Sequence, residues 1–139
     1  MKIAVMGEIH EDGWKVFEDN NLESFKLLNF EENNLKKELS EVDAILLRTA
    51  RLSNDVLSFC KKLKIVSRHG VGYDNINLEY LNQNNIALGI TSTSNAVSVA
   101  EHVLTSFLYL SKNIHLSDRL TREGKFNDKS SLPNFFLLY

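Results

Sequence analysis

The sequence is poor in the residues that define several classes of protein. Its 139 residues include a single cysteine, Cys60, which excludes an intrachain disulfide and a cysteine-based metal cluster. The formal net charge of −2 gives no electrostatic case for a nucleic-acid partner or an anionic membrane. No apolar run reaches membrane-spanning length, and the residues after Met1 do not resemble a secretory signal. These absences predict a soluble globular chain located in the cytoplasm.

Two further absences concern cofactors. No histidine pair has the spacing of metal ligands, so we predict no metal site. The sequence also lacks a G-x-G-x-x-G element between a strand and a helix, which is the signature of a dinucleotide site. The nearest approach, Gly70-Val71-Gly72, continues with Tyr-Asp-Asn and has no third glycine.

Short apolar segments alternate with amphipathic ones along the first two thirds of the chain, and this alternation predicts a parallel sheet covered by helices. With right-handed crossovers, the predicted fold class is α/β: a flavodoxin-like three-layer domain with a five-stranded parallel sheet. The predicted strands are residues 2–6, 25–28, 44–47, 63–66 and 86–90. The predicted helices are residues 11–20, 31–41, a segment capped by Ser53, and 78–84.

The pattern changes at Asn95, which is a plausible N-cap. Apolar residues dominate from there to Ile114, and we predict a long connecting helix that ends near Ser117. Its apolar surface exceeds what one small domain usually covers, which predicts a homodimer through helix 95–114. We therefore divide the chain into residues 1–94 and 95–139; the last ten residues end on apolar side chains.

Polar and glycine residues gather at one predicted edge of the sheet. Arg48-Thr49, residues 69–72 and residues 91–94 each follow a strand, and ligands of such sheets bind beyond the carboxyl ends of the strands. The turn at Gly70 and Gly72 can present successive N–H groups to a small anion. Such a turn can equally be purely structural, with Asp74 or Asn75 capping the next helix.

Three motifs resemble those of the D-isomer-specific 2-hydroxyacid dehydrogenases. Residues 68–77 (Arg-His-Gly-Val-Gly-Tyr-Asp-Asn-Ile-Asn) are similar to the family's R-x-G-x-G-x-D-N-I-D segment. Residues 46–49 (Leu-Leu-Arg-Thr) resemble its strand ending in R-[ST], and residues 95–103 resemble its N-x-x-S-V-A-E-H segment. The motifs occur in the family's order, and the resemblance covers residues 1 to about 125.

The resemblance implies a role for each motif. His69, Gly70, Val71 and Gly72 correspond to the loop that holds the substrate carboxylate, and Arg48 to a substrate-contacting arginine of phosphoglycerate-type members. The segment that contains Asn95, Ser98 and Glu101 lies near the nicotinamide and the domain hinge in the family. As alternatives, Arg48 can be a solvated surface residue, and these three can serve to cap the helix and make its first turn polar.

The family's catalytic arginine, acid and histidine belong to a later part of its chain. We therefore expect residues 1–94 to be the substrate-binding domain and residues 95–139 to lead into a missing Rossmann domain. The intact family protein would use NAD and a small 2-hydroxy or 2-keto acid, whereas no cofactor is expected to bind this truncated, inactive chain. Two alternatives remain: a non-catalytic dimeric interaction module, and a receiver-like signalling domain. The receiver alternative is disfavoured because Asp43 lies at the start of its strand, not at the end.

Overall fold

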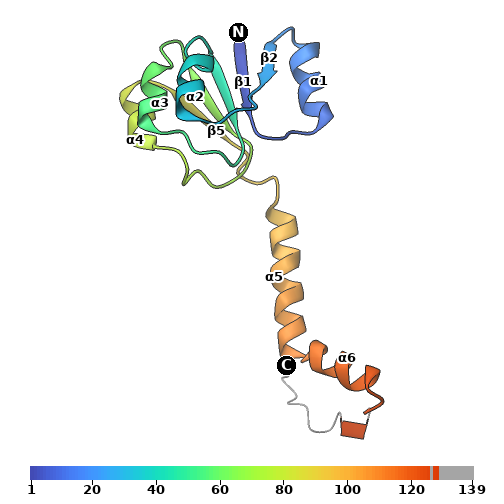
Figure 1. The fold of residues 1–139 in the computed structure, drawn as a ribbon. Coiled ribbons are helices and arrows are strands. Elements are labelled where there is room, and N and C mark those ends of the chain that lie inside the picture. Colours follow the sequence, from blue (N-terminus) through green and yellow to red (C-terminus); the bar gives the residue numbers. More distant parts are fainter. Residues whose placement is uncertain (126, 129–139) are drawn as a thin grey trace. The chain divides into compact units, whose positions relative to one another are not determined.

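The computed structural model describes residues 1–125 and 127–128, and five short strands form the centre of its first compact unit, residues 1–94 (Figure 1). All neighbouring strands are parallel, and their order in the sheet is β2-β1-β3-β4-β5. This order is that of the flavodoxin-like fold, so the predicted α/β class and the five-stranded parallel sheet are confirmed. The strands are β1 (Lys2–Met6), β2 (Glu23–Lys26), β3 (Ala44–Leu47), β4 (Ile65–Arg68) and β5 (Ala87–Ile90).

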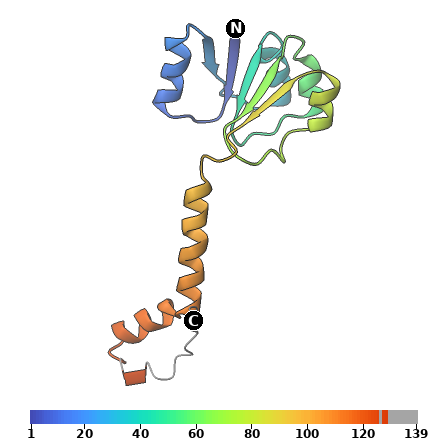
Figure 2. The same ribbon diagram turned by 180° about the vertical axis from the view of Figure 1, so that it is seen from behind.

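Helices connect consecutive strands, and α2, α3 and α4 gather on one face of the sheet (Figure 1). Figure 2 shows the opposite side of the sheet, and α1 contacts the edge strand β2. Side chains of a strand alternate between the two faces, so every second residue joins the core with the helices. Met6, Ile45 and Leu47 belong to that core and are fully buried. The four helices are α1 (Glu11–Asp19), α2 (Glu32–Glu38), α3 (Asn54–Phe59) and α4 (Leu78–Gln83).

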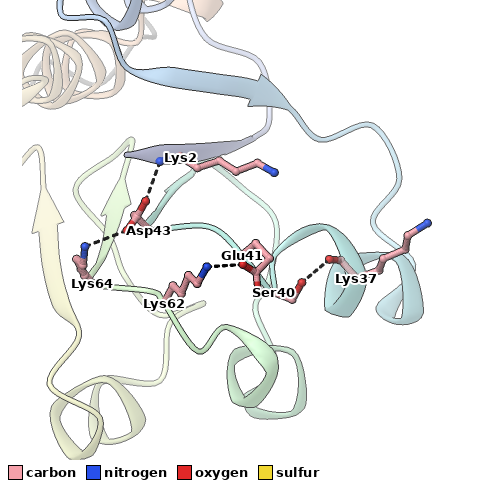
Figure 3. Close-up of polar contacts among 7 residues, drawn as sticks. All are labelled: Lys2, Lys37, Ser40, Glu41, Asp43, Lys62 and Lys64. Carbon is pink, nitrogen blue, oxygen red and sulfur yellow. Dashed lines mark hydrogen bonds and ion pairs between the residues drawn. The ribbon is translucent and has the colours of Figure 1, made fainter.

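The amino edge of the sheet, where the parallel strands begin, is closed by charged pairs (Figure 3). Asp43 precedes β3; its Oδ2 accepts the backbone N–H of Lys2 at 2.9 Å, and its Oδ1 lies 2.9 Å from the Lys64 Nζ. Glu41 and Lys62 form a second ion pair beside it. The backbone hydrogen bond from Lys2 and the Lys64 ammonium hold the pKa of Asp43 below its usual value. This aspartate therefore joins the starts of three strands.

Residues from Asn95 onward form a second compact unit. The structure has two helices where the sequence predicted one: α5 (Ala96–Ser111) and α6 (Ile114–Arg122). The break occurs at Asn113, whose φ of 48° is left-handed, a conformation that asparagine adopts more readily than most residues. Ile114, which we assigned to the long helix, thus begins α6. The predicted apolar end, residues 130–139, lies outside the described residues.

Several predicted boundaries are shifted. β2 and β4 each begin two residues away from their predicted starts, at Glu23 and Ile65. The helix α4 begins at Leu78 as predicted, but its cap is Asn77 and not Asp74 or Asn75. The Asn77 Oδ1 accepts the Tyr80 N–H at 3.1 Å. Ser53 caps α3 as predicted, through a 3.2 Å hydrogen bond from the Val56 N–H. Within the described part of the chain, no helix is both long and apolar enough to cross a bilayer.

Candidate functional site

The carboxyl edge of the sheet, where the strands end, carries the predicted substrate-binding residues. Arg48 follows β3, and His69 follows β4, the neighbouring strand. The register pairs Leu47 with Arg68, and the His69 N–H donates to the Leu47 carbonyl oxygen at 2.8 Å. The structure therefore brings Arg48 and the segment 69–72, hereafter the glycine loop, to adjacent positions on one edge.

Arg48 is exposed and anchored to the loop that follows β1. Its Nη1 donates to the backbone carbonyl oxygen of Glu8 at 2.9 Å, while the Glu8 carboxylate pairs with Lys26. The stem of Arg48 lies so close to Gly7 that a Cβ there would be 2.8 Å from the Arg48 Cβ. Gly7 has a φ of 126°, so only glycine fits this approach without strain. The arginine is thus held at the edge with part of its guanidinium in solvent.

The glycine loop is hydrogen-bonded to the sheet through Gly70, whereas the N–H groups of its next two residues have no hydrogen-bond acceptor in the described chain. The Gly70 N–H donates to the Arg68 carbonyl oxygen at 2.9 Å, and the Gly70 carbonyl oxygen accepts the Thr91 N–H at 3.3 Å. In the described chain, the N–H groups of Val71 and Gly72 form no hydrogen bond. Both residues are exposed. Two adjacent amide donors at one position are suited to an anion such as a carboxylate.

Asn75 fixes the segment that follows the glycine loop. Its Nδ2 donates to the Ala50 carbonyl oxygen at 2.6 Å and so ties the turn after β4 to the turn after β3. Asn77 makes a second link, from its Nδ2 to the Asn54 Oδ1 at 3.1 Å. These contacts hold together the two loops that carry the candidate residues.

Three hollows lie along this edge. One of about 460 Å³ is bounded by Arg48, Lys26 and Phe30, and one of about 410 Å³ shares Phe30 with it and reaches Arg51. A third, of about 370 Å³, lies between residues 51–54 and 74–77. The first has an apolar wall and two cationic side chains, of which Lys26 is paired with Glu8, another residue of the lining. Arg48 is therefore its candidate contact for a small organic acid.

Asn95, Ser98 and Glu101 belong to the second unit. Asn95 occupies the N-cap position of α5 as predicted, but its side chain makes no capping hydrogen bond. Ser98 and Glu101 lie three residues apart in that helix and are therefore neighbours along its surface. All three side chains are exposed. Their predicted place near a nicotinamide and a hinge stays a prediction.

The described residues contain no group of three histidine, cysteine, aspartate or glutamate side chains that could hold a metal ion. Cys60 is a buried free thiol within the core, and its Sγ donates to the Val56 carbonyl oxygen at 3.4 Å. Burial raises the pKa of this thiol to about 11. A thiol with such a pKa is not a nucleophile near neutral pH.

Sequence reasoning overlooked two contributors to this edge. Gly7 is needed for the approach of Arg48, and Arg68 lies directly against Gly70, whose added Cβ would be 2.9 Å from the Arg68 Nη1. A signal was available for both positions, because Gly7 directly follows the first predicted strand and Arg68 is the first residue of the motif at 68–77. The signal does not show that the two glycines and the two arginines pack in pairs.

Comparison with known proteins gives a consistent result. Residues 3–136 match the family described as D-isomer specific 2-hydroxyacid dehydrogenase, catalytic domain. D-3-phosphoglycerate dehydrogenase of Archaeoglobus fulgidus is 31% identical over 130 residues, which are 93% of this chain and 25% of the relative. The same enzyme of Mycobacterium bovis is 39% identical over 84 residues, covering 60% of this chain and 16% of the relative. The chain thus spans about a quarter or less of these relatives' lengths.

Solved structures agree with the fold. A protein of Pyrococcus horikoshii aligns with a TM-score of 0.86 at 24% identity, over 99% of this chain and 43% of that one. The NAD-dependent formate dehydrogenase of Staphylococcus aureus, solved in complex with NAD, aligns with a TM-score of 0.71 at 28% identity. That alignment covers 94% of this chain and 44% of the other.

Proposed function

This chain belongs to the D-isomer specific 2-hydroxyacid dehydrogenase family, and on that premise we propose that residues 1–94 are a substrate-binding domain. The ligand is a small 2-hydroxy or 2-keto acid of the phosphoglycerate or hydroxypyruvate type. One observation carries the proposal: the N–H groups of Val71 and Gly72 are unpaired in the described chain, on the edge where Arg48 also lies. In this arrangement the two amides hold the carboxylate, and Arg48 meets a second polar group of the acid.

The full reaction of such an enzyme exchanges a hydride between the acid and NAD(H), and the glycine loop differs from a dinucleotide loop. A dinucleotide loop opens directly into a helix, whose N–H groups face the pyrophosphate. Here α4 begins at Leu78, well after Gly72, and its first turn is occupied by the Asn77 side chain. We therefore propose that these 139 residues bind substrate without turning it over, and that NAD binds to another part of the intact enzyme.

The proposal is tested by titrating the isotopically labelled chain with glyoxylate, hydroxypyruvate and 3-phosphoglycerate while following backbone amide shifts by NMR. The Val71 and Gly72 amides should shift most, because a carboxylate would accept their hydrogen bonds. Arg48→Met should weaken 3-phosphoglycerate binding more than glyoxylate binding, since only the longer acid has a second anionic group that can reach Arg48. Shifts spread evenly over the surface, with no cluster at the glycine loop, would refute the proposal.

NADH is the second titrant, measured by calorimetry on the same sample. We expect no saturable heat from NADH and no change of its absorbance when hydroxypyruvate is added. Stoichiometric NADH binding, or turnover by the chain alone, would overturn the assignment to substrate binding only.

The apolar surface of α5 supports a second candidate function, a homodimeric interaction module. Most of its side chains are apolar, and none is buried. Val97, Val103 and Leu110 have exposed fractions of 72%, 61% and 66%. We propose that two copies pair through this helix, within residues 95–114, because unpartnered apolar surface of this kind favours association. Light scattering should report a dimer, and Val103→Glu with Leu110→Glu should convert it to a monomer; a monomeric parent chain would exclude the pairing.

We also propose a cytoplasmic location. The support is the buried free thiol of Cys60, which suits a reducing compartment, together with a soluble small-acid ligand. Fractionation of cells that express the tagged chain tests this location, and recovery in the membrane or secreted fraction would contradict it.

A further inference from the structure

Arg68, the last residue of β4, holds the first peptide group of the glycine loop from two sides. Its backbone carbonyl oxygen accepts the Gly70 N–H at 2.9 Å, and its Nη1 donates to the His69 carbonyl oxygen at 2.7 Å. The Gly70 N–H and the His69 carbonyl oxygen, which these two contacts engage, are the opposite ends of the peptide group that joins His69 to Gly70. Because that group is planar and trans, its N–H and C=O point in opposite directions, so the two contacts together fix its rotation.

The guanidinium also fills the space beside Gly70. A Cβ built at Gly70 would lie 2.9 Å from the Arg68 Nη1, 3.1 Å from its Cζ and 3.2 Å from its Nη2. Gly70 therefore has two reasons to be glycine: a φ of 155° and the presence of this guanidinium. The planar group lies against the backbone, with no side chain between them.

The orientation of the next peptide group follows from this arrangement. The Gly70 carbonyl oxygen faces the Thr91 N–H, so the N–H at the other end of that peptide, which belongs to Val71, points away from Thr91. Arg68 and Thr91 thus form hydrogen bonds with the His69 carbonyl oxygen and with the N–H and carbonyl oxygen of Gly70. The N–H groups of Val71 and Gly72 remain available as donors. The direction of those donors depends on the peptide groups that precede them.

The charge of Arg68 is not compensated by a side chain. The structure records no carboxylate within ion-pair distance of it in the described chain, and its Nε is buried without a hydrogen-bond partner there. The nearest acid of the loop is Asp74, whose Oδ2 would lie 3.4 Å from a Cβ at Gly72. An anion at Val71 and Gly72 is repelled by that carboxylate, and a guanidinium beneath the loop opposes the repulsion.

We propose that Arg68 is the positioning residue of the carboxylate site: it fixes the peptide between His69 and Gly70, and so aims the Val71 and Gly72 amides while supplying a compensating positive charge. The inference rests on the proposed substrate-binding function for the identity of the anion. The fixing of the loop is a property of the chain without ligand, and it can be measured separately.

The first experiment uses the unliganded chain. Arg68→Met removes the donor and the charge, Arg68→Lys keeps the charge but loses the planar group against Gly70, and Lys62→Met removes one charge at the opposite edge as a control. We expect the Gly70 and Thr91 amides to exchange with solvent about tenfold faster in both Arg68 variants. Arg68→Met loses the charge-assisted hydrogen bond to the His69 carbonyl oxygen, and Arg68→Lys loses its geometry. Lys62→Met should match the parent chain, and thermal unfolding confirms that every variant is folded.

The second experiment measures binding of glycolate, and of glycolamide as its uncharged analogue. Arg68→Met should bind glycolate at least tenfold more weakly, and Arg68→Lys should recover part of that loss. Glycolamide, whose carbonyl oxygen accepts from the same two amides, should lose affinity too, but less, because it does not sense the charge. An equal loss for both ligands would overturn the charge-compensating role, and no loss for glycolamide would overturn the aiming of the amides. If Arg68→Met does not fold, Arg68→Lys decides, since it must show faster exchange with partly retained affinity.

The two experiments separate failure of the inference from failure of the proposed function. If the parent chain does not bind glycolate, the substrate-binding proposal falls, and the exchange data alone judge whether Arg68 fixes the loop. If the parent chain binds glycolate and both Arg68 variants bind it equally well, the function stands and the inference is wrong. Unchanged exchange at Gly70 and Thr91 overturns the inference in either case.

Discussion

At the amino edge of the sheet, charged side chains meet opposite charges, whereas at the carboxyl edge arginines meet backbone carbonyl oxygens. Asp43 and Glu41 are each paired with a lysine at the first edge. At the second, Arg48 donates to the Glu8 carbonyl oxygen and Arg68 to that of His69. In the described chain neither arginine has a carboxylate at ion-pair distance.

This difference has a physical meaning. A carbonyl oxygen can orient a guanidinium but cannot cancel its charge, so the carboxyl edge retains positive potential. At the amino edge, the carboxylates of Asp43 and Glu41 are each paired with a lysine, and these contacts serve to join the strand starts. The same sheet thus has one edge built for cohesion and another that can still attract an anion.

The largest effect on stability and on glycolate binding should come from Gly70→Ala, which changes the carboxyl edge at the glycine loop. Its Cβ would overlap the Arg68 guanidinium at a backbone angle that alanine rarely adopts, at a cost of about 2 kcal/mol in the free energy of unfolding. Glycolate binding should be lost with it. Urea unfolding and NMR titration measure the two effects. Gly13→Ala, within α1, is the matched control and should be neutral or slightly stabilising.

A smaller effect is expected from Asn75→Ala. This change removes the 2.6 Å hydrogen bond to the Ala50 carbonyl oxygen and leaves that oxygen without its partner, which should lower the free energy of unfolding by about 1.5 kcal/mol. Asn82→Ala, at an exposed position of α4, should change it by less than about 0.5 kcal/mol. Equal urea midpoints for the two variants would show that the tie between the loops contributes nothing.

At the amino edge, Asp43→Asn tests cohesion through its dependence on pH. The pKa of Asp43 is lowered in the folded chain, so its ionised form adds stability that is fully present above the unfolded pKa, near 4. That stability is lost as the pH falls below about 4 and through the folded pKa. The variant should therefore melt at a lower temperature than the parent at pH 7, and the gap should close as the pH falls through the folded pKa of Asp43. A gap that is constant with pH would mean that the carboxylate charge plays no part.

The smallest effect is expected from Lys62→Met. The ammonium of Lys62 is exposed and pairs with Glu41, which raises its pKa. An exposed pair of this kind contributes little, so the melting temperature in 0.15 M salt should be unchanged within error. Glycolate affinity should also be unchanged. A clear loss of affinity would show that the two edges are not electrically independent.

The sequence predicted the sheet well where apolar runs have sharp polar limits. β3 was predicted at 44–47 and observed there, because Asp43 and Arg48 bound four apolar residues. β4 was placed two residues early, because its last two residues, Ser67 and Arg68, are polar and strand pairing carries them beyond the apolar run. Hydrophobic pattern reports burial, whereas hydrogen bonding to β3 and β5 decides where the strand ends.

The candidate site was only partly readable in the sequence. The motif located Gly70, Val71 and Gly72, and strand order brought Arg48 to the same edge. Nothing in the sequence distinguished the Gly70 amide, which is bonded to Arg68, from the two amides that remain open. Likewise, apolar residues recur without a break over residues 95–114, which predicted one helix. The turn between α5 and α6 depends on the left-handed backbone of Asn113, which hydrophobic periodicity does not detect.

The hydrogen bond from Thr91 to Gly70 makes the glycine loop depend on β5, an edge strand of the sheet. Thr91 directly follows β5, which lies at the sheet edge and pairs only with β4. Edge strands open at a lower free energy than central ones, so fraying of β5 would release the loop while the other strands stay paired. The loop would then loosen before the central strands separate. Ligand affinity would then decline on warming before the sheet as a whole unfolds.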